Sequence, residues 1–277
     1  MKRIFAFGCS FTKYHYPTWA DIIISNGIYD ESYNMGRSGA GNQYIVTKLW
    51  EANALYNFCE TDTILIGWTY FGREDRYIED SGWHTPGNSY QFLQNSMRAY
   101  NNYICENDFI WYNPLHFAMR DCMLITSTKL ALQQLKVNII DAQVCSYESF
   151  KDINHMKDTE MNRYPLGLDD VPFINGMYDN YLKTCLGSIV SSYQYPGLED
   201  DTTRPSWTND QMSFQNKIES HPLPIEHLKF VEDSFIGVNY DTRKWVHSWQ
   251  DYIQQNSPIH YPLAYADNYN TNMGWSG

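Results

Sequence analysis

The sequence has no long hydrophobic run. Its longest apolar stretches contain only a few residues, far fewer than the ~18 that a membrane-spanning helix needs. The segment from Met1 to Gly8 contains two basic residues, but its apolar part is too short for the core of a signal peptide. These absences predict no membrane partner and a cytoplasmic protein, or a virion-associated one if the source is a virus.

The six cysteines follow none of the spacings that disulfide-rich or zinc-binding folds use. They are scattered between Cys9 and Cys185, with no CxxC pair and no Cys/His spacing typical of zinc. Widely spaced cysteines favour reduced thiols in a cytoplasm. The glycine patterns of nucleotide-binding loops, GxGxxG and GxxxxGK[ST], are also absent.

Positive charge is scarce. The chain has 20 lysines and arginines against 32 aspartates and glutamates, which gives a formal net charge of −12 and an isoelectric point near 5.0. Such a surface repels polyanions. Nucleic acid and anionic membrane surfaces are therefore not expected as partners.

Aromatic residues are abundant. The 277 residues include 23 Tyr, 9 Trp and 13 Phe, at a mean hydropathy of −0.52. Rings with a flat apolar face and a polar tip suit both stacking on sugars and contacts between subunits. The composition therefore leaves two interpretations open, a carbohydrate ligand and a homo-oligomer or larger assembly.

Apolar segments predict buried strands, and amphipathic segments between and after them predict helices. Because these strands are continuously apolar rather than alternating, they favour a parallel sheet that is covered on both faces. The βαβ succession predicts an α/β fold with three layers, α/β/α, around a mostly parallel sheet. The expected strands are Arg3–Gly8, Ser32–Met35, Thr63–Trp68 and Val137–Ala142, and the expected helices are Pro17–Ser25, Gln43–Leu55, Leu115–Leu135, Pro224–Phe235 and Thr242–Gln254.

Three stretches depart from this rhythm. Residues 73–109 are rich in Tyr, Asn and Gly and have no clear apolar stripe before residue 95. Residues 147–216 contain four prolines among Asp, Asn and Tyr, which predicts an irregular insertion with short helices, because structureless loops of that length are uncommon in compact domains. Residues 258–277 form an aromatic tail without periodicity, which wraps the domain or docks on a partner. We expect a single domain over residues 1–257 that includes the insertion and is followed by the tail.

Small and polar residues follow three of the expected strands. Ser10 comes after the first strand, Gly39 belongs to a glycine-rich turn at 34–42 after the second, and Thr69 follows the third. Open α/β sheets bind ligands beyond the carboxyl ends of their strands. A serine that enters a helix there would lie beside the N–H donors of the helix N-terminus. The alternative is that Ser10 only caps this helix.

A loop near the carboxyl end contains the best-placed histidine. His221 is followed by a proline that restrains the loop, and Glu219 stands two residues earlier, where it could orient the imidazole. The alternative is a surface loop that leads into a helix starting at Pro224. Weaker candidates for substrate contacts are Asn42, Arg73 and His227.

Together these residues resemble the sequence blocks of the SGNH (GDSL-like) hydrolase family over most of the chain. Gly8-Cys9-Ser10-Phe11-Thr12 looks like the first block, which implies that Ser10 is the nucleophile and that its N–H donates to the oxyanion. Gly39 looks like the glycine of the second block. Gly67-Trp68-Thr69 lies where the family has Gly-x-Asn, which implies an oxyanion hole of Ser10, Gly39 and Thr69.

The last block of the family resembles the loop at His221. His221-Pro222 looks like its His-Pro, which implies that His221 is the base, and the form His-Pro-x-Pro-x-x-His is similar to members found in phages and environmental bacteria. The chain departs from the family at three positions. Cys9 replaces Asp in the first block, Thr69 replaces Asn in the third, and Ile218 stands three residues before His221, so Glu219 is the candidate orienting carboxylate.

The resemblance implies a flavodoxin-like fold and a serine esterase that needs neither a metal nor an organic cofactor. Its substrate would be an acylated carbohydrate, such as an O-acetyl sugar, or another small ester. The alternative is a non-catalytic SGNH-like module that binds glycans or serves as a structural part of a virion. A third hypothesis makes the thiol of Cys9 the nucleophile.

Overall fold

The computed structural model describes residues 1–69, 73–79, 82–85, 114–144, 206–207, 217–218, 221–234 and 237–255. Glu219, most of the expected insertion at 147–216 and the expected tail at 258–277 lie outside these ranges. Among the helices within them, none combines the length and hydropathy needed to cross a membrane.

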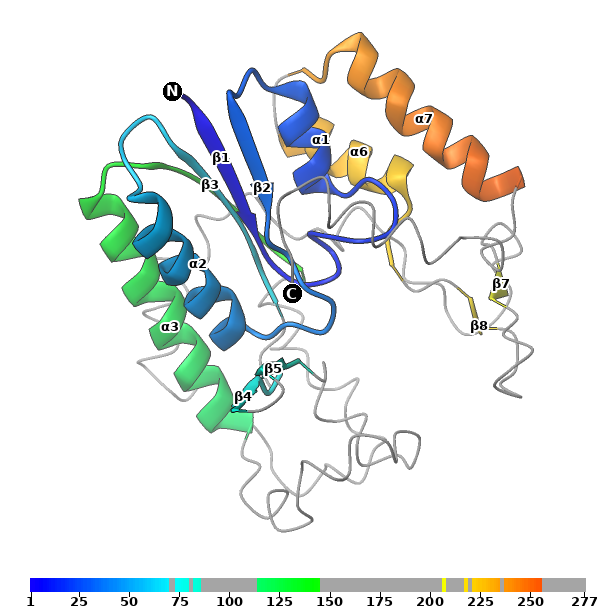
Figure 1. The fold of residues 1–277 in the computed structure, drawn as a ribbon. Helices are drawn as coiled ribbons and strands as arrows, with labels where there is room; N and C mark the ends of the chain where they lie inside the picture. The colour runs from blue at the N-terminus through cyan, green and yellow to red at the C-terminus, as the bar shows by residue number, and fades with distance from the viewer. Residues whose placement is uncertain are drawn as a thin grey trace.

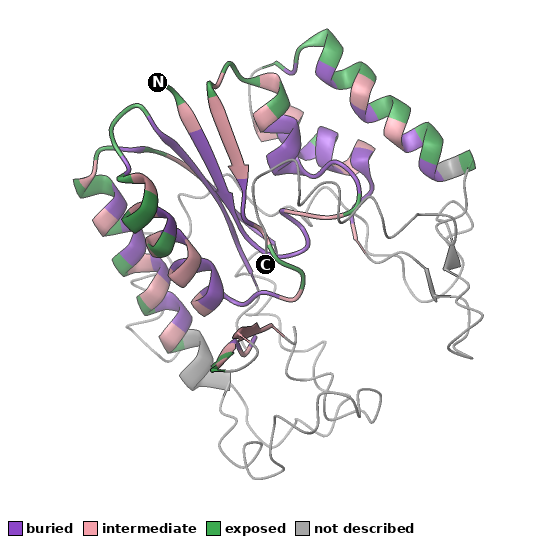
Figure 2. Ribbon diagram, in the orientation of Figure 1, coloured by how far each residue is buried: buried purple, intermediate pink, exposed green. Residues whose placement is uncertain are grey.

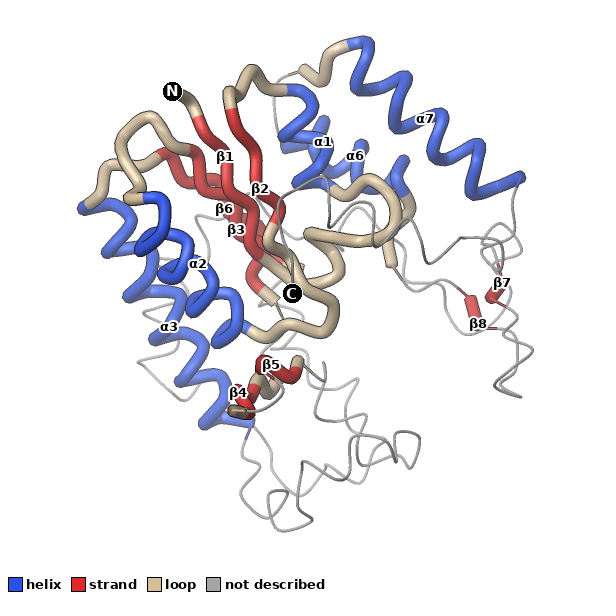
Figure 3. Tube along the Cα trace, viewed as in Figure 1, coloured by secondary structure: helices blue, strands red, loops and turns tan. Residues whose placement is uncertain are grey.

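Four parallel strands form the central sheet (Figures 1 and 3). The two inner strands are almost wholly buried because they are apolar on both faces, whereas the two edge strands are partly exposed. The order across the sheet is β2 (Glu31–Asn34), β1 (Arg3–Phe7), β3 (Thr63–Trp68) and β6 (Asn138–Gln143). The expected α/β class with a parallel sheet is confirmed, and each strand lies within one residue of its expected bounds.

Helices cover both faces of this sheet (Figure 1). On one side α2 packs against α3, and on the other α1 packs against α6, with α7 against both. Their bounds are α1 (Trp19–Asn26), α2 (Asn42–Tyr56), α3 (Pro114–Gln134), α6 (Pro224–Ser234) and α7 (Tyr240–Gln255). All five lie within two residues of the expected bounds.

The path of the chain explains this division of the helices. From β1 the chain moves outward to β2, then returns past β1 to β3, and continues in that direction to β6. Crossovers between parallel strands are right-handed in nearly all proteins, so a reversal of direction moves the connecting helix to the opposite face. The reversal falls between β1 and β3, and the carboxyl ends of such a strand pair are where open α/β sheets bind their ligands.

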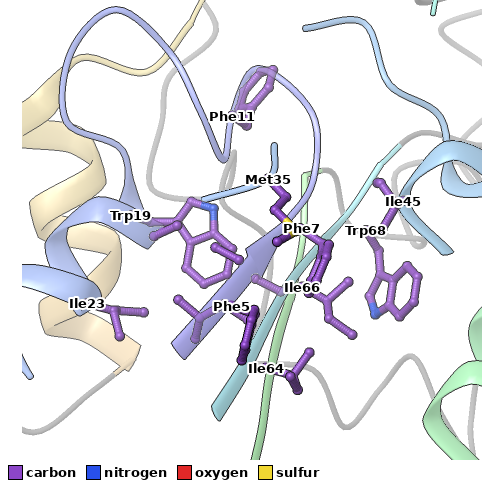
Figure 4. Packing of buried hydrophobic residues seen from close by; sticks show 14 of the residues in the cluster. Phe5, Phe7, Phe11, Trp19, Ile23, Met35, Ile45, Ile64, Ile66 and Trp68 are labelled. Atoms are coloured by element: carbon purple, nitrogen blue, oxygen red, sulfur yellow. The ribbon is translucent and has the colours of Figure 1, made fainter. Parts of the chain in front are cut away.

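The hydrophobic core lies on both faces of β1 and β3 (Figures 2 and 4). On one face Trp19 of α1 is fully buried and meets Phe230 of α6 edge to face, with ring centroids 6.1 Å apart. Ile45 of α2 and Trp68 of β3 are buried on the other side (Figure 4). Each large apolar side chain buried in this way contributes about 1.5–3 kcal/mol, so the core fixes the strand ends on which the site is built.

In the described part of the chain, two short antiparallel hairpins accompany the sheet. One consists of β7 (Ser206–Trp207) and β8 (Lys217–Ile218), and the other of β4 (Arg76–Ile78) and β5 (Gly82–His84). The β4–β5 hairpin is tied to the turn after β2, because Arg37 Nη2 donates to the Trp83 carbonyl (2.6 Å) and Thr85 Oγ1 donates to the Ser38 carbonyl (2.8 Å).

Candidate active site

The turn that follows β1 depends on two glycines. A Cβ atom on Gly8 would lie 1.9 Å from Thr12 Oγ1, and one on Gly67, near the end of β3, would lie 2.5 Å from the same atom. Real Cβ atoms do not approach that closely, so the side chain of Thr12 occupies space that only glycine leaves open at both strands. This packing fixes the turn that carries Ser10 against the end of β3.

Ser10 lies in this turn and not at the start of a helix. The N–H groups of Thr12 and Lys13 both donate to the Cys9 carbonyl, at 2.9 and 3.1 Å. The helix α1 begins nine residues after Ser10, and its N-cap is Thr18, whose N–H donates to the Asp21 carboxylate (3.0 Å). The expectation that Ser10 enters or caps a helix is therefore wrong, because a loop that runs to the N-cap Thr18 separates its turn from α1.

Ser10 and His221 meet. The distance from His221 Nε2 to Ser10 Oγ is 2.9 Å, although 211 positions separate the two residues in the chain. This is a normal hydrogen-bond length. When Nε2 is unprotonated, the serine hydroxyl donates to it, which is the arrangement that a serine nucleophile and its general base require.

The loop that holds His221 is fixed by the start of α6. Pro224 occupies the first helical position, where its missing N–H costs nothing, and Glu226 accepts a hydrogen bond from the N-cap N–H of Leu223 (2.6 Å). Leu223 also packs with Tyr16 of the β1–α1 loop and Ile253 of α7 in a second buried cluster. These contacts dock the His221 loop onto the loop that carries Ser10.

Two aromatic rings of the β1–α1 loop contact the imidazole of His221. Tyr14 stacks on it, with centroids 4.1 Å apart and ring planes 23° apart. Phe11 lies 5.2 Å away at a tilt of 44°. The loop therefore supplies both the serine and the rings around its histidine partner.

The glycine-rich turn after β2 is tied to the Ser10 turn by Asn34. Asn34 Nδ2 donates to the Thr12 carbonyl and to Asp21 Oδ1, both at 2.8 Å, and its Oδ1 accepts from the N–H of Gly36 (3.1 Å). The Arg37 N–H donates to the Gly8 carbonyl (2.9 Å). The two turns thus meet beyond the ends of adjacent strands.

This arrangement leaves backbone donors unused. Gly39 has a φ of 74°, a left-handed conformation that glycine adopts without strain. Among the described residues, no group accepts a hydrogen bond from the N–H of Gly39 or of Ser10. Both are available to a ligand oxygen.

Thr69 lies directly after β3 with an unused hydroxyl. Its Oγ1 is buried and has no hydrogen-bond partner in the described part of the chain. Its N–H donates to Asn42 Oδ1 (3.0 Å), and Asn42 Nδ2 donates to Asp121 Oδ2 (3.0 Å) and the Thr69 carbonyl (3.2 Å). The side chain of Asn42 is fully buried, and its amide positions the backbone of Thr69. The expected contact of Asn42 with substrate stays a prediction.

Arg73 and Asp75 support the turn that contains Gly39. Arg73 is buried, and its Nη1 donates to the Ala40 carbonyl (2.8 Å), so it holds the turn. Its expected contact with substrate stays a prediction. Asp75 accepts from the N–H groups of Gly41 and Tyr44, each at 2.8 Å. It thereby caps α2, whose own N-cap residue, Gly41, has no side chain to do so.

Two buried titratable side chains, Asp121 and His227, have shifted pKa values. Burial raises the pKa of Asp121 to about 6, although Arg120 and Asn42 donate hydrogen bonds to its carboxylate. Burial, assisted by the nearby His221, lowers the pKa of His227 to about 3, so this ring is neutral. His227 lies on the core side of α6 with almost no exposed surface, which does not fit the expected substrate contact.

Sequence reasoning missed several positioning residues. An Asn two residues before a glycine is a turn signal that could have identified Asn34. Nothing in the local sequence marks Asp75 as the cap of α2, because the Gly41 N–H that donates to it lies 34 positions earlier in the chain. Nothing there marks Tyr14 as the residue that stacks on His221 either. Within the described ranges, no group of three or more His, Cys, Asp or Glu side chains is arranged to hold a metal ion.

Comparisons with known proteins do not identify the chain. No protein-family model matches it. No curated protein matches it either.

Proposed function

We propose that this protein is a serine ester hydrolase of the SGNH type, with Ser10 as nucleophile and His221 as base. The observation that supports it best is the 2.9 Å hydrogen bond between Ser10 Oγ and His221 Nε2. This hydrogen bond lies beyond the carboxyl ends of β1 and β3, between which the strand order reverses. Open α/β folds bind their ligands at such a position. The finer fold type, a three-layer flavodoxin-like sheet, is part of this proposal.

In the first half of the reaction, Ser10 Oγ attacks the carbonyl carbon of the ester while His221 Nε2 takes the hydroxyl proton. A tetrahedral intermediate forms, with negative charge on the former carbonyl oxygen. The bond to the leaving alcohol then breaks, and the imidazolium of His221 returns the proton to the alcohol. An acyl-serine remains on Ser10.

In the second half, a water molecule replaces the alcohol. His221 accepts a proton from this water as its oxygen attacks the acyl carbon. The second intermediate collapses, and Ser10 leaves with the proton from His221. A carboxylic acid is released and the enzyme returns to its starting state.

Three donors are available for the negative charge of the intermediates. The N–H groups of Ser10 and Gly39 have no acceptor among the described residues, and neither does the hydroxyl of Thr69. Preorganised donors of this kind stabilise an oxyanion more than they stabilise the ground-state ester. A buried hydroxyl without a partner, such as that of Thr69 among the described residues, is uncommon in proteins, and an oxyanion would supply its acceptor.

The substrate we propose is an O-acyl carbohydrate, such as an O-acetyl sugar. The β4–β5 hairpin places aromatic rings beside the Gly39 turn, since Trp83 and Thr85 are hydrogen-bonded to Arg37 and Ser38. Tyr77 of this hairpin is 66% exposed and meets the Trp83 ring edge to face at 5.7 Å. Exposed rings of this kind suit stacking on a pyranose.

The test is hydrolysis of p-nitrophenyl acetate by the wild type and by Ser10→Ala. We expect Ser10→Ala to lower kcat at least about 10³-fold. The matched control is Ser127→Ala, because Ser127 is an exposed serine of α3 whose hydroxyl bonds only to carbonyls of its own helix.

Equal rates for the wild type and Ser10→Ala would refute the esterase. Glycan binding without any hydrolysis would favour the non-catalytic module, which the replacement of Asn by Thr69 makes the main alternative. Loss of activity on alkylation of Cys9, with Ser10→Ala still active, would favour the thiol.

A further inference from the structure

Tyr14 contacts the base of the proposed reaction directly. Its ring stacks on the His221 imidazole with centroids 4.1 Å apart and planes 23° apart. In this geometry the aromatic face covers the face of the imidazole and leaves the ring edge, which contains Nε2, turned toward Ser10. A face contact therefore fixes the plane of the imidazole without competing for its nitrogen atoms.

The same loop fixes both Tyr14 and Ser10. Two backbone hydrogen bonds to the Cys9 carbonyl close the turn, and Tyr14 meets the ring of the buried Tyr16 edge to face at 4.8 Å. Tyr16 belongs to the buried cluster that docks the His221 loop. Tyr14 and Ser10 thus belong to one loop that these contacts hold, so their positions relative to the imidazole are coupled.

The stacked ring also affects the charge that develops during the reaction. His221 becomes an imidazolium each time it takes a proton from Ser10 or from water. The face of an aromatic ring carries partial negative charge and attracts a cation that lies over it. The contact is therefore stronger in the charged state than in the resting state, which is the condition for lowering a barrier.

We propose that Tyr14 is a positioning residue for His221, whose ring face orients the imidazole toward Ser10 and stabilises its cation. This inference rests on the proposed function. In it, the support that Tyr14 gives to the His221 imidazole does not depend on a carboxylate. This role depends on the aromatic face of Tyr14, so the phenyl ring of a phenylalanine at this position must be able to serve in place of the phenol.

The experiment compares Tyr14→Leu and Tyr14→Phe with the wild type. Readouts are the rate at which a fluorophosphonate labels Ser10, and kcat and KM for p-nitrophenyl acetate. Tyr14→Leu is expected to lower the labelling rate and kcat about tenfold with KM changed less than about twofold, and Tyr14→Phe to keep most of both. The matched control is Tyr240→Leu, because Tyr240 is a 76% exposed tyrosine at the start of α7.

A spectroscopic readout does not depend on the leucine variant folding. The His221 ring protons of the wild type, assigned by their absence in His221→Gln, are expected to show an upfield ring-current shift that Tyr14→Phe retains. Ring protons without this shift would overturn the inference. The inference would also be overturned if Ser10 of Tyr14→Leu were labelled as fast as that of the wild type, or if Tyr14→Phe were labelled as slowly as Tyr14→Leu. A wild type that is never labelled at Ser10 would instead overturn the proposed function together with this inference.

Discussion

Three residues of the candidate site have hydrogen-bonding groups that the described residues leave unused. Ser10 and Gly39 each offer a backbone N–H, and Thr69 offers a buried hydroxyl, for which the described residues supply no acceptor. A buried polar group without a partner costs about 1–3 kcal/mol. These three groups follow the carboxyl ends of β1, β2 and β3, where open α/β sheets bind ligands, which is the reason to assign them to an oxyanion.

The hydroxyl of Thr69 gives the sharpest prediction for a single residue. Thr69→Val keeps the shape of the side chain and removes the donor, so kcat for p-nitrophenyl acetate should fall about 10²-fold with little change in KM. The melting temperature should not fall, because Oγ1 has no partner to lose among the described residues. Steady-state kinetics and thermal unfolding of the same preparation check both parts. Unchanged kcat would remove Thr69 from the oxyanion hole.

The elements of the fold meet at the carboxyl ends of β1 and β3, and Thr12 packs between them. Its Oγ1 occupies the space that a Cβ on Gly67 would need, whereas the next nearest atom to that Cβ is Trp19 Cζ2 at an ordinary 3.5 Å. The clash thus involves one side chain. This makes the junction of the two strands testable by a pair of substitutions.

Gly67→Ala is predicted to lower the free energy of unfolding by about 1–3 kcal/mol, because Thr12 must move. In the Thr12→Ala background the same change should cost much less, since the obstructing Oγ1 is gone. Denaturant unfolding of the two single variants and the double variant gives the coupling energy between the positions. Additive costs would show that Thr12 does not occupy this space.

The sequence predicts these elements better than it predicts their connections. Continuously apolar strands and periodic helices appear close to their expected bounds, because burial on the sheet imposes both patterns. The order of the motifs along the chain and the family resemblance together predict that Ser10 and His221 meet. The cap of α1 by Thr18, the cap of α2 by Asp75 and the stacking of Tyr14 could not be predicted, since each depends on how loops distant in the chain fold against one another.

At the scale of the whole molecule, an ion pair lies at the end of the sheet opposite the candidate site. Arg3 of β1 donates to both carboxylate oxygens of Asp62, at 2.8 and 2.7 Å, and to the Tyr56 carbonyl (3.0 Å). Burial alone would raise the pKa of Asp62, but the hydrogen bonds from Arg3 and from the Cys59 N–H outweigh it and lower that pKa below its ordinary value. The charged form of Asp62 is therefore favoured by folding.

This pair predicts how stability depends on pH. Because its pKa is lower in the folded state, Asp62 stabilises the fold above its unfolded value of about 3.9, and this stabilisation is lost as the pH falls through the folded pKa. Arg3→Met should lower the free energy of unfolding by about 2 kcal/mol at pH 7. The difference from the wild type should shrink below about pH 4, because a protonated Asp62 gains little from Arg3.

Denaturant unfolding of both proteins, measured at intervals of about 0.5 pH unit between pH 3 and pH 7, gives this difference directly. Taking the difference between the two proteins also removes the opposite contribution of Asp121, whose raised pKa favours the fold at lower pH in both. A difference that stays constant across this range would contradict the role assigned to the pair.

Ester hydrolysis at this site requires a nucleophilic serine that is activated by its histidine. The most direct measurement is to treat the full chain with a fluorophosphonate, locate the adduct by mass spectrometry of its peptides, and repeat the reaction with His221→Gln. We predict a single adduct on Ser10 in the wild type, formed at a rate that drops sharply in His221→Gln. An unmodified Ser10, or equal labelling of the two proteins, would contradict the account.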